Sequence, residues 1–151
     1  MQSAVSESAL GNRTLFVLIA ILSFAGISVS AISLQRHYAK SASEFCDFSQ
    51  KFNCDIVNRS EYSEVEGMPV AGIGVLGYAA LFFLSTFWIS RTETPNRLLA
   101  ASISGLCFAL YLTYVEAGRL KTWCILCVIS QALILLITMF AAVIKLRRAK
   151  D

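Results

Sequence analysis

Charged residues are scarce in this 151-residue chain: only 15% of the residues are Asp, Glu, Lys or Arg, while 56% are hydrophobic. An average soluble domain has about 25% charged residues. Four long runs, at residues 15–34, 70–89, 98–115 and 125–144, contain no charged side chain. A helix of about 20 apolar residues crosses the roughly 30 Å hydrocarbon core of a bilayer. The sequence therefore predicts a membrane protein and excludes an ordinary soluble domain.

The chain is also poor in histidine and in closely spaced cysteine pairs, which limits the catalytic and metal sites that it can form. The chain has one histidine, His37, and a single histidine without a partner is more often an interfacial residue than a catalytic base. A Cys₄ zinc or iron–sulfur site usually uses two closely spaced cysteine pairs, and Cys46 and Cys54 lie too far apart in sequence to supply the second. We therefore predict no metal. The chain also lacks a basic patch with interleaved aromatic residues, so we predict no nucleic-acid partner.

The apolar runs predict an all-α integral membrane protein, a four-helix bundle in which residues 1–151 form a single membrane domain with an extracytoplasmic loop that carries a short helix. The first run follows Arg13 and could instead be a cleaved signal peptide. It is longer than the about 7–15 residues of a signal h-region, so we expect a helix there. The predicted helices are 15–34, 70–89, 98–115 and 124–144, and the predicted outer loop is 35–69.

An even number of spans places both termini on the same side of the membrane. The C-terminal tail carries Lys145, Arg147, Arg148 and Lys150, and positively charged ends prefer the cytoplasm. We therefore expect a multi-pass protein of the cell (inner) membrane with both termini cytoplasmic and the loop 35–69 outside.

This topology places four of the five cysteines at the outer surface, where disulfides persist. Cys124 and Cys127 lie three residues apart at the start of the last predicted helix. Free backbone N–H groups at a helix start stabilise a thiolate and lower its pKa. The pair is therefore a candidate redox site, and the alternative is two packing cysteines. Cys107, alone in the middle of a span, is expected to pack.

Cys46 and Cys54 form the second group of outer cysteines. On a continuous helix they would be about 12 Å apart, whereas a disulfide needs Cα atoms within about 7 Å. The loop must therefore fold back if the two pair. Taken alone, they suggest a structural disulfide that holds the loop together. Because Cys124 and Cys127 lie on the same side of the membrane, a redox role is favoured instead.

The remainder of the loop suggests a short helix at the membrane surface. Asn58 followed by Glu61 resembles a capping box, and Gly67 followed by Pro69 resembles a stop. We predict a helix over residues 59–66, with Ser60 in its first turn.

Two cysteine pairs on the same side of the membrane suggest a relay, because thiol exchange moves electrons two at a time through mixed disulfides. A lipid-soluble quinone is the natural final acceptor for a pair at the edge of the bilayer. Gln131, one turn beyond Cys127, is a polar amide in an apolar span and requires a hydrogen-bond partner. That partner could be a quinone carbonyl or a neighbouring helix.

Three segments, "CDFSQKFNCDIVNRS", "GMPVAGIGVLGY" and "WCILC", resemble the vitamin K epoxide reductase family and in particular its bacterial homologues. The resemblance covers most of the chain. It implies a four-helix bundle around a quinone, with Cys124 and Cys127 as the active-site pair and Cys127 next to the ring. It also implies that Cys46 and Cys54 are a loop shuttle pair, and that Ser60 is the loop serine near the active site.

The vertebrate enzymes have an asparagine near the start of the second helix and a tyrosine four residues after the last cysteine. The corresponding positions are Val70 and Gln131 here, so we expect reduction of ubiquinone or menaquinone and not of an epoxide. In bacterial members the electron donor resembles a periplasmic thioredoxin-fold protein, in several cases fused at the C-terminus. Because the basic tail that ends at Asp151 is predicted to be cytoplasmic, we expect a separate partner.

The sequence thus predicts a membrane thiol–disulfide oxidoreductase that oxidises a thioredoxin-fold partner and passes electrons through two cysteine pairs to a quinone. The predicted cofactor-contacting residues are Cys127, Ser60 and Gln131. One alternative is a non-enzymatic tetraspan membrane protein whose outer loop is stapled by a disulfide. Another is a quinone-dependent enzyme that takes electrons from a small thiol.

Overall fold

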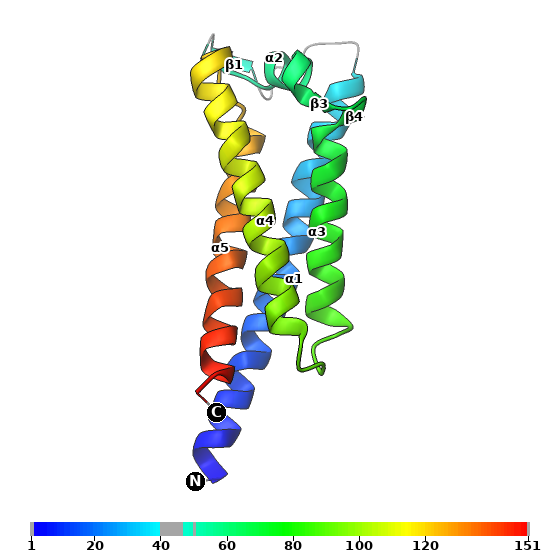
Figure 1. Ribbon diagram of the computed structural model, residues 1–151. Coiled ribbons are helices and arrows are strands. Elements are labelled where there is room, and N and C mark those ends of the chain that lie inside the picture. Colours follow the sequence, from blue (N-terminus) through cyan, green and yellow to red (C-terminus); the bar gives the residue numbers. More distant parts are fainter. Residues whose placement is uncertain (1, 40–46, 50, 151) are drawn as a thin grey trace.

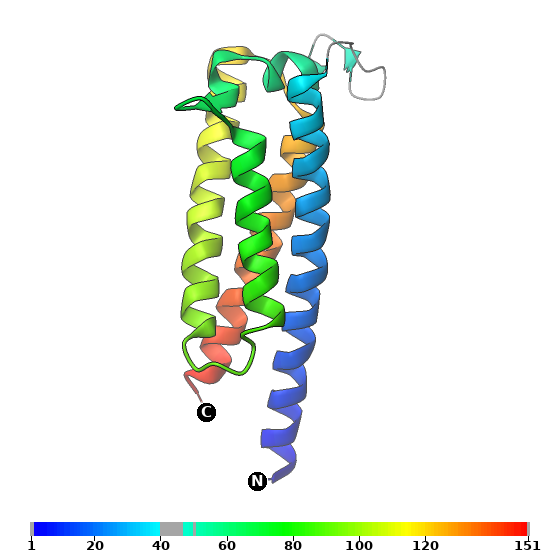
Figure 2. The same cartoon turned by 90° about the vertical axis from the view of Figure 1, so that its right-hand side faces the viewer.

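The computed structural model describes residues 2–39, 47–49 and 51–150. Four long helices lie side by side along one axis (Figures 1 and 2). Helix α1 packs against α3 and α5, and α4 packs against α5. The four helices are α1 (Gln2–Tyr38), α3 (Val70–Thr86), α4 (Thr94–Val115) and α5 (Ile125–Arg148).

Three helical stretches among the described residues are long and apolar enough to cross a bilayer: Leu10–Tyr38, Thr94–Leu120 and Ile125–Arg148. Helix α3 is apolar but has only 17 residues, which corresponds to about 26 Å. The predicted helix over 70–89 therefore extends too far. Its end is marked by Ser85 and Thr86, whose hydroxyls donate to the carbonyl of Phe82 at 2.9 and 2.8 Å and compete with the backbone pattern.

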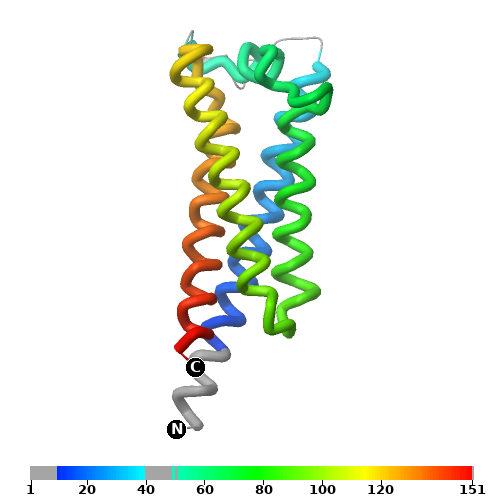
Figure 3. Tube along the Cα trace, in the orientation of Figure 1, coloured from blue at the N-terminus to red at the C-terminus, as the bar shows by residue number. Residues whose placement is uncertain are grey.

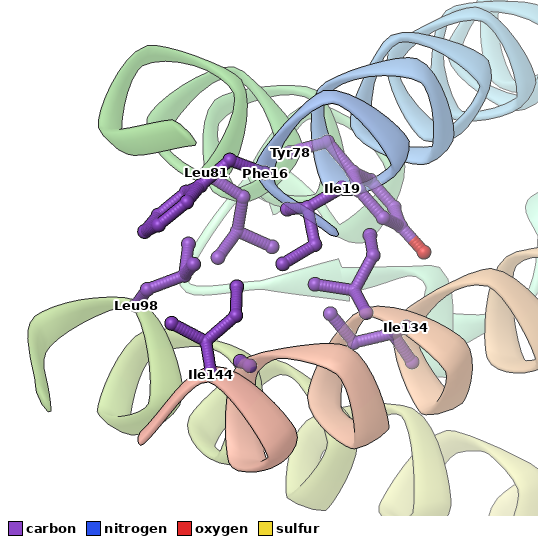
Figure 4. Close-up of a cluster of buried hydrophobic side chains, with 9 residues drawn as sticks. Phe16, Ile19, Tyr78, Leu81, Leu98, Ile134 and Ile144 are labelled. Atoms are coloured by element: carbon purple, nitrogen blue, oxygen red, sulfur yellow. The ribbon is translucent and has the colours of Figure 1, made fainter. Parts of the chain in front are cut away.

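The long helices meet in a core of aliphatic and aromatic side chains. Helices α1 and α3 come especially close, because a Cβ atom added at Gly26 would lie 2.3 Å from the ring of Tyr78. The Tyr78 hydroxyl crosses to α5 and donates to the carbonyl of Ser130 at 2.7 Å. Figure 4 shows seven labelled members of this core: Phe16, Ile19, Tyr78, Leu81, Leu98, Ile134 and Ile144.

The loop between α1 and α3 contains a five-residue helix and two small hairpins, and the predicted helix over 59–66 is wrong. Its elements are β1 (Asp47–Ser49), β2 (Phe52–Asn53), α2 (Cys54–Asn58), the 3₁₀ turn η1 (Glu61–Ser63), β3 (Glu64–Val65) and β4 (Met68–Pro69).

The helix begins earlier than predicted because Asn53, and not Asn58, is its N-cap. The Asn53 Oδ1 atom accepts a hydrogen bond from the Ile56 N–H at 2.9 Å, as an N-cap side chain does. The segment predicted to be helical instead reverses direction at Glu66 and Gly67, which have φ angles of 52° and 81° and connect β3 to β4. A left-handed pair of this kind fits a tight hairpin turn and breaks a helix.

The basic C-terminal tail and the cysteine-bearing loop lie at opposite ends of the bundle. The start of α1 lies beside the end of α5, since a Cβ atom added at Gly11 would be 2.8 Å from an Arg147 guanidinium nitrogen. Figure 3 follows this arrangement along the chain, with the α2 loop at the opposite end of the bundle. The basic tail and the cysteine-bearing loop are therefore separated by the length of the helices.

Candidate redox site

Cys124 and Cys127 lie at the start of α5, at the end of the bundle covered by the loop. Cys124 is the N-cap residue, in extended conformation, and its carbonyl accepts the first helical hydrogen bond, from the Val128 N–H at 3.0 Å. The helix thus begins one residue later than predicted, at Ile125. Both thiols are free, and Cys124 is completely buried whereas Cys127 is half-buried.

The connection from α4 to α5 brings a carboxyl group to this pair. Helix α4 continues into a π-helical turn, η2 (Glu116–Leu120), and the chain then reverses at Lys121, which has a left-handed φ of 51°. As a result the Glu116 Oε2 atom accepts a hydrogen bond from the Cys124 backbone N–H at 3.3 Å. Glu116 is 4% exposed. Single π-turns inside helices often mark functional sites.

The Cys124 thiol is the more acidic partner of the pair. The Cys127 side chain donates a hydrogen bond to Cys124, which lowers the pKa of Cys124 below its usual value even though burial opposes this. Backbone N–H groups of Cys127 and Leu126 in the first turn act in the same direction. Cys124 is therefore the sulfur of the pair that is better prepared to exist as a thiolate.

The outer loop is attached to the residue before Cys124 by backbone hydrogen bonds. Trp123 N–H donates to the Lys51 carbonyl at 2.7 Å, and Asn53 N–H donates to the Trp123 carbonyl at 3.2 Å. This short parallel bridge aligns the segment that leads into Cys54 with the segment that leads into Cys124. Cys54 and Cys124 are both 0% exposed and belong to one buried cluster with Val57 and Leu126.

Of the two predicted loop cysteines, only Cys54 lies within the described residues. Cys54 is disulfide-bonded and forms the first residue of α2. Cys46 lies outside the described residues. The structure therefore brings Cys54, Cys124 and Cys127 together, and the position of Cys46 stays a prediction.

A cavity of about 390 Å³ opens beside Cys127 in the half of the bundle nearest the loop. Its wall is mostly apolar and is built from α1, α3, α4, α5 and the loop, with Ala101, Phe108, Leu112 and Ile134 among its lining residues. Cys54 and Cys124 do not line it. The two cysteines of the pair consequently have different surroundings: Cys124 is buried in the cluster with Cys54, whereas Cys127 packs against that cluster and also lines the cavity.

The loop and the end of α1 contribute several of the polar residues that line the cavity. His37 links α1 to the loop, because its Nδ1 atom lies 2.6 Å from the Asn58 carbonyl oxygen and its Nε2 atom lies 3.1 Å from the Glu64 carboxylate. Ser60 lines the cavity as predicted, with its hydroxyl donating to the Val57 carbonyl at 2.8 Å. Asn58 is also among the cavity-lining residues, and its Nδ2 atom is buried without a hydrogen-bond partner among the described residues.

Gln131 is hydrogen-bonded to a neighbouring helix, and its predicted contact with a quinone stays a prediction. Its Oε1 atom accepts a hydrogen bond from the Thr113 hydroxyl of α4, and Gln131 is not among the cavity-lining residues. Of the two alternatives left open by the sequence, this contact corresponds to the neighbouring helix. Cys107 is exposed on the outer surface of α4 and does not pack in the core, contrary to expectation.

Sequence reasoning missed Glu116 and Asn58 as members of the site. The signal for Glu116 was an acidic residue directly after an uncharged 18-residue run, where burial is possible. Asn58 was interpreted as a helix cap, and only the fold places this residue at the cavity with its Nδ2 atom buried. Within residues 2–39, 47–49 and 51–150, no cluster of three or more His, Cys, Asp or Glu side chains is arranged to hold a metal.

A helical membrane protein with a free dithiol pair beside an apolar cavity is the expected architecture of a membrane-embedded thiol oxidoreductase. Residues 17–142 match the vitamin K epoxide reductase family. The chain belongs to this family, which implies an oxidoreductase activity within the membrane. A comparison with curated proteins finds no match.

Proposed function

We propose that this protein oxidises a thioredoxin-fold partner and passes the electrons through the loop cysteines and then through Cys124 and Cys127 to a quinone. The observation that carries this proposal is the division of the helix-start pair. Cys124 is buried in one cluster with Cys54, while Cys127 lines the cavity. Electrons can therefore enter the pair on one side and leave it on the other.

The proposed exchange conserves electrons and bonds at each step. A partner thiolate attacks the loop disulfide at Cys46, which frees the Cys54 thiolate. Cys54 then attacks Cys124, so that a Cys54–Cys124 disulfide forms and the Cys124–Cys127 bond breaks. The partner's second thiolate then attacks the partner sulfur of the mixed disulfide, which completes the partner's disulfide and frees the Cys46 thiolate. Cys46 attacks Cys54, so that the loop disulfide re-forms, the Cys54–Cys124 bond breaks, and Cys124 and Cys127 are left as a reduced pair.

The cavity fits the head of a quinone on two grounds. Its volume of about 390 Å³ and apolar wall suit a small-molecule site. A quinone carbonyl needs a hydrogen-bond donor, and Asn58, a residue of the wall, has a buried Nδ2 without a partner among the described residues that is a candidate for this role. Ser60 is a second candidate contact, although its proton is used by the Val57 carbonyl. A quinone bound there would accept two electrons from the reduced cysteine pair and would take up two protons in all, as many as the partner's two thiols release.

The proposed topology places the loop and both cysteine pairs outside the cytoplasmic membrane and both termini inside. The support is the separation of the basic end, with Lys145, Arg147 and Arg148, from the cysteine-bearing end of the bundle. A thioredoxin-fold partner outside the membrane would then meet the loop directly. Ubiquinone and menaquinone are both suitable acceptors, since each is dissolved in the bilayer.

The test is quinone reduction by the purified protein in detergent, with either a reduced thioredoxin-fold protein or a small dithiol as donor. We expect wild-type protein to reduce the quinone, and Cys124→Ala and Cys127→Ala to lose at least about 10²-fold in rate, because removal of a reacting nucleophile leaves little catalysis. Cys107→Ala is the matched control, since this cysteine is free but lies on the outer surface of α4.

The same assay separates the alternatives. A stapled, non-enzymatic tetraspan protein would give no quinone reduction with any donor and no effect of the cysteine variants. An enzyme that uses a small thiol would accept the dithiol but not the thioredoxin-fold protein. Quinone reduction that persists in both Cys124→Ala and Cys127→Ala would remove the proposed route altogether.

A further inference from the structure

Glu116 is a buried carboxyl without a cationic partner at the redox site. Its Oε2 atom accepts the Cys124 N–H at 3.3 Å, and its carboxyl also hydrogen-bonds to the Cys127 side chain. The ion pairs found within the described residues are His37–Glu64 and Arg97–Glu93, so none of them neutralises Glu116 there. A buried carboxylate without a counter-ion is costly to keep charged. Such a group is suited to exchange a proton with a neighbour.

The proposed exchange needs a proton at the sulfur that Glu116 contacts. Whenever the Cys124–Cys127 disulfide opens, the electron pair leaves on Cys127, and a buried thiolate there must be protonated. Whenever the disulfide forms again, the same thiol must release its proton. Cys127 lines the apolar cavity, and Glu116 lines the same cavity beside it. The carboxyl is therefore placed beside a sulfur whose charge changes at an apolar cavity, away from bulk water.

We propose that Glu116 carries the proton of Cys127, an inference that rests on the proposed function. As Cys54 bonds to Cys124 and the Cys124–Cys127 bond breaks, the Glu116 carboxylic acid gives its proton to the departing Cys127 sulfur. As the disulfide re-forms and its two electrons pass to the quinone, the Cys127 thiol returns that proton to the Glu116 carboxylate. Glu116 is unchanged over the cycle. The two protons released by the partner's thiols equal the two taken up with the electrons.

Few other titratable groups face this carboxyl. From α5 and its N-cap these are Cys127 and Cys124. From the loop, Asp55 is also buried near the cysteine cluster, next to Cys54 in α2. From α1, His37 lines the cavity but is paired with Glu64. Arg119 and Lys121, on the turn after Glu116, are exposed.

The test compares Glu116→Gln with Glu116→Ala and with the exposed control Glu61→Gln. Glutamine keeps an oxygen that accepts the Cys124 N–H but has no proton to transfer, whereas alanine removes both functions. Two rates are measured over a range of pH: quinone reduction, and opening of the Cys124–Cys127 disulfide by a small dithiol without quinone, followed by alkylation of the freed thiols. Disulfide opening reports on Cys127 protonation independently of any quinone.

We expect Glu116→Gln to slow both rates by at least about 10²-fold, a usual contribution of a positioned proton donor, and to lose the pH dependence caused by a carboxyl group. Glu61→Gln should behave as wild type. The proposal is overturned if Glu116→Gln opens its disulfide within about twofold of the wild-type rate with the same pH profile while Glu116→Ala fails, because the carboxyl then only supports the backbone. Wild-type protein that opens its disulfide but never reduces quinone would instead refute the proposed function.

Discussion

Cys54 and Cys124 are both completely buried and pack in one cluster at the end of the bundle. Their approach is fixed by the backbone on either side, since Trp123 exchanges hydrogen bonds with Lys51 and Asn53 of the loop. Bulk thiols cannot easily reach a cysteine of 0% exposure. The arrangement therefore favours exchange between these two sulfurs over exchange of Cys124 with small thiols in solution.

Removal of Cys127 should trap the exchange between loop and helix. In Cys127→Ala, the Cys124 thiolate can still attack Cys54 of the loop disulfide and release Cys46, but no neighbouring thiol on α5 can then break the Cys54–Cys124 disulfide. We expect this disulfide to accumulate, with detection by mass spectrometry of linked peptides and by mobility on non-reducing gels. Cys107→Ala should give no such species. Normal turnover in Cys127→Ala, without any loop-to-helix disulfide, would contradict the order of steps.

The reactivity of Cys124 should depend on the hydrogen bond from Cys127. This bond lowers the pKa of Cys124, so the thiolate persists to lower pH than for an ordinary cysteine and is lost only as the pH falls through the lowered value. Cys127→Ala removes the donor, and the alkylation profile of Cys124 should move to higher pH. Cys127→Ser keeps a hydroxyl donor and should move it less. If the pH midpoints of Cys124 alkylation were identical in wild type and Cys127→Ala, the hydrogen bond from Cys127 would not be what lowers the pKa of Cys124.

Asn58→Leu should weaken quinone binding without weakening the fold. The Nδ2 atom is buried without a partner among the described residues, and an unsatisfied buried donor costs about 1–3 kcal/mol. Leucine has a similar volume and removes that cost, so the melting temperature in detergent without quinone should stay equal or rise. The KM for quinone should increase by about tenfold, which corresponds to about 1.4 kcal/mol. A lower melting temperature with unchanged KM would show a purely structural amide.

Gly26→Ala should destabilise the bundle. The new Cβ would lie 2.3 Å from the Tyr78 ring, which cannot swing away while its hydroxyl is bonded to Ser130. The gain in helix propensity is up to about 1 kcal/mol, whereas overpacking of a tight contact costs about 1–3 kcal/mol. Gly77→Ala is the control, because nothing lies within 4 Å of its Cβ. We expect thermal unfolding in the same detergent to give a lower melting temperature for Gly26→Ala than for Gly77→Ala. Equal melting temperatures would mean that α1 and α3 pack less closely than the Gly26–Tyr78 contact indicates.

The sequence predicted the helices better than the loop, for a physical reason. Long uncharged runs are a strong signal, and α4 and α5 contain the predicted runs with the helix-start pair at its expected end. In the loop, Asn53 and Asn58 were equally plausible caps by residue type. Long-range contacts decide between them: the strand pairing of β2 with Trp123 fixes the chain just before Cys54, so the helix starts there.

The spacing of the cysteines suggested that Cys54, Cys124 and Cys127 lie at one end of the bundle, where the structure has them, whereas Cys46 and the roles of these residues stay predictions. Glu116 and Asn58 could not be assigned, since their importance arises from burial beside Cys124 and from an amide left without a partner. The sequence left two hydrogen-bond partners open for Gln131, a quinone carbonyl or a neighbouring helix. Only the fold brings the Thr113 hydroxyl of α4 to the Gln131 side chain.

The most direct test of the relay is a single turnover of pre-reduced Cys54→Ser protein with quinone under anaerobic conditions, followed by the absorbance of the quinol. If Cys124 and Cys127 alone deliver electrons to the quinone, this variant should form quinol at the wild-type rate in the first turnover. It should then fail to turn over with a thioredoxin-fold donor. Loss of the first turnover in Cys54→Ser, with wild type active, would mean that the loop cysteine reduces the quinone itself and would contradict the account.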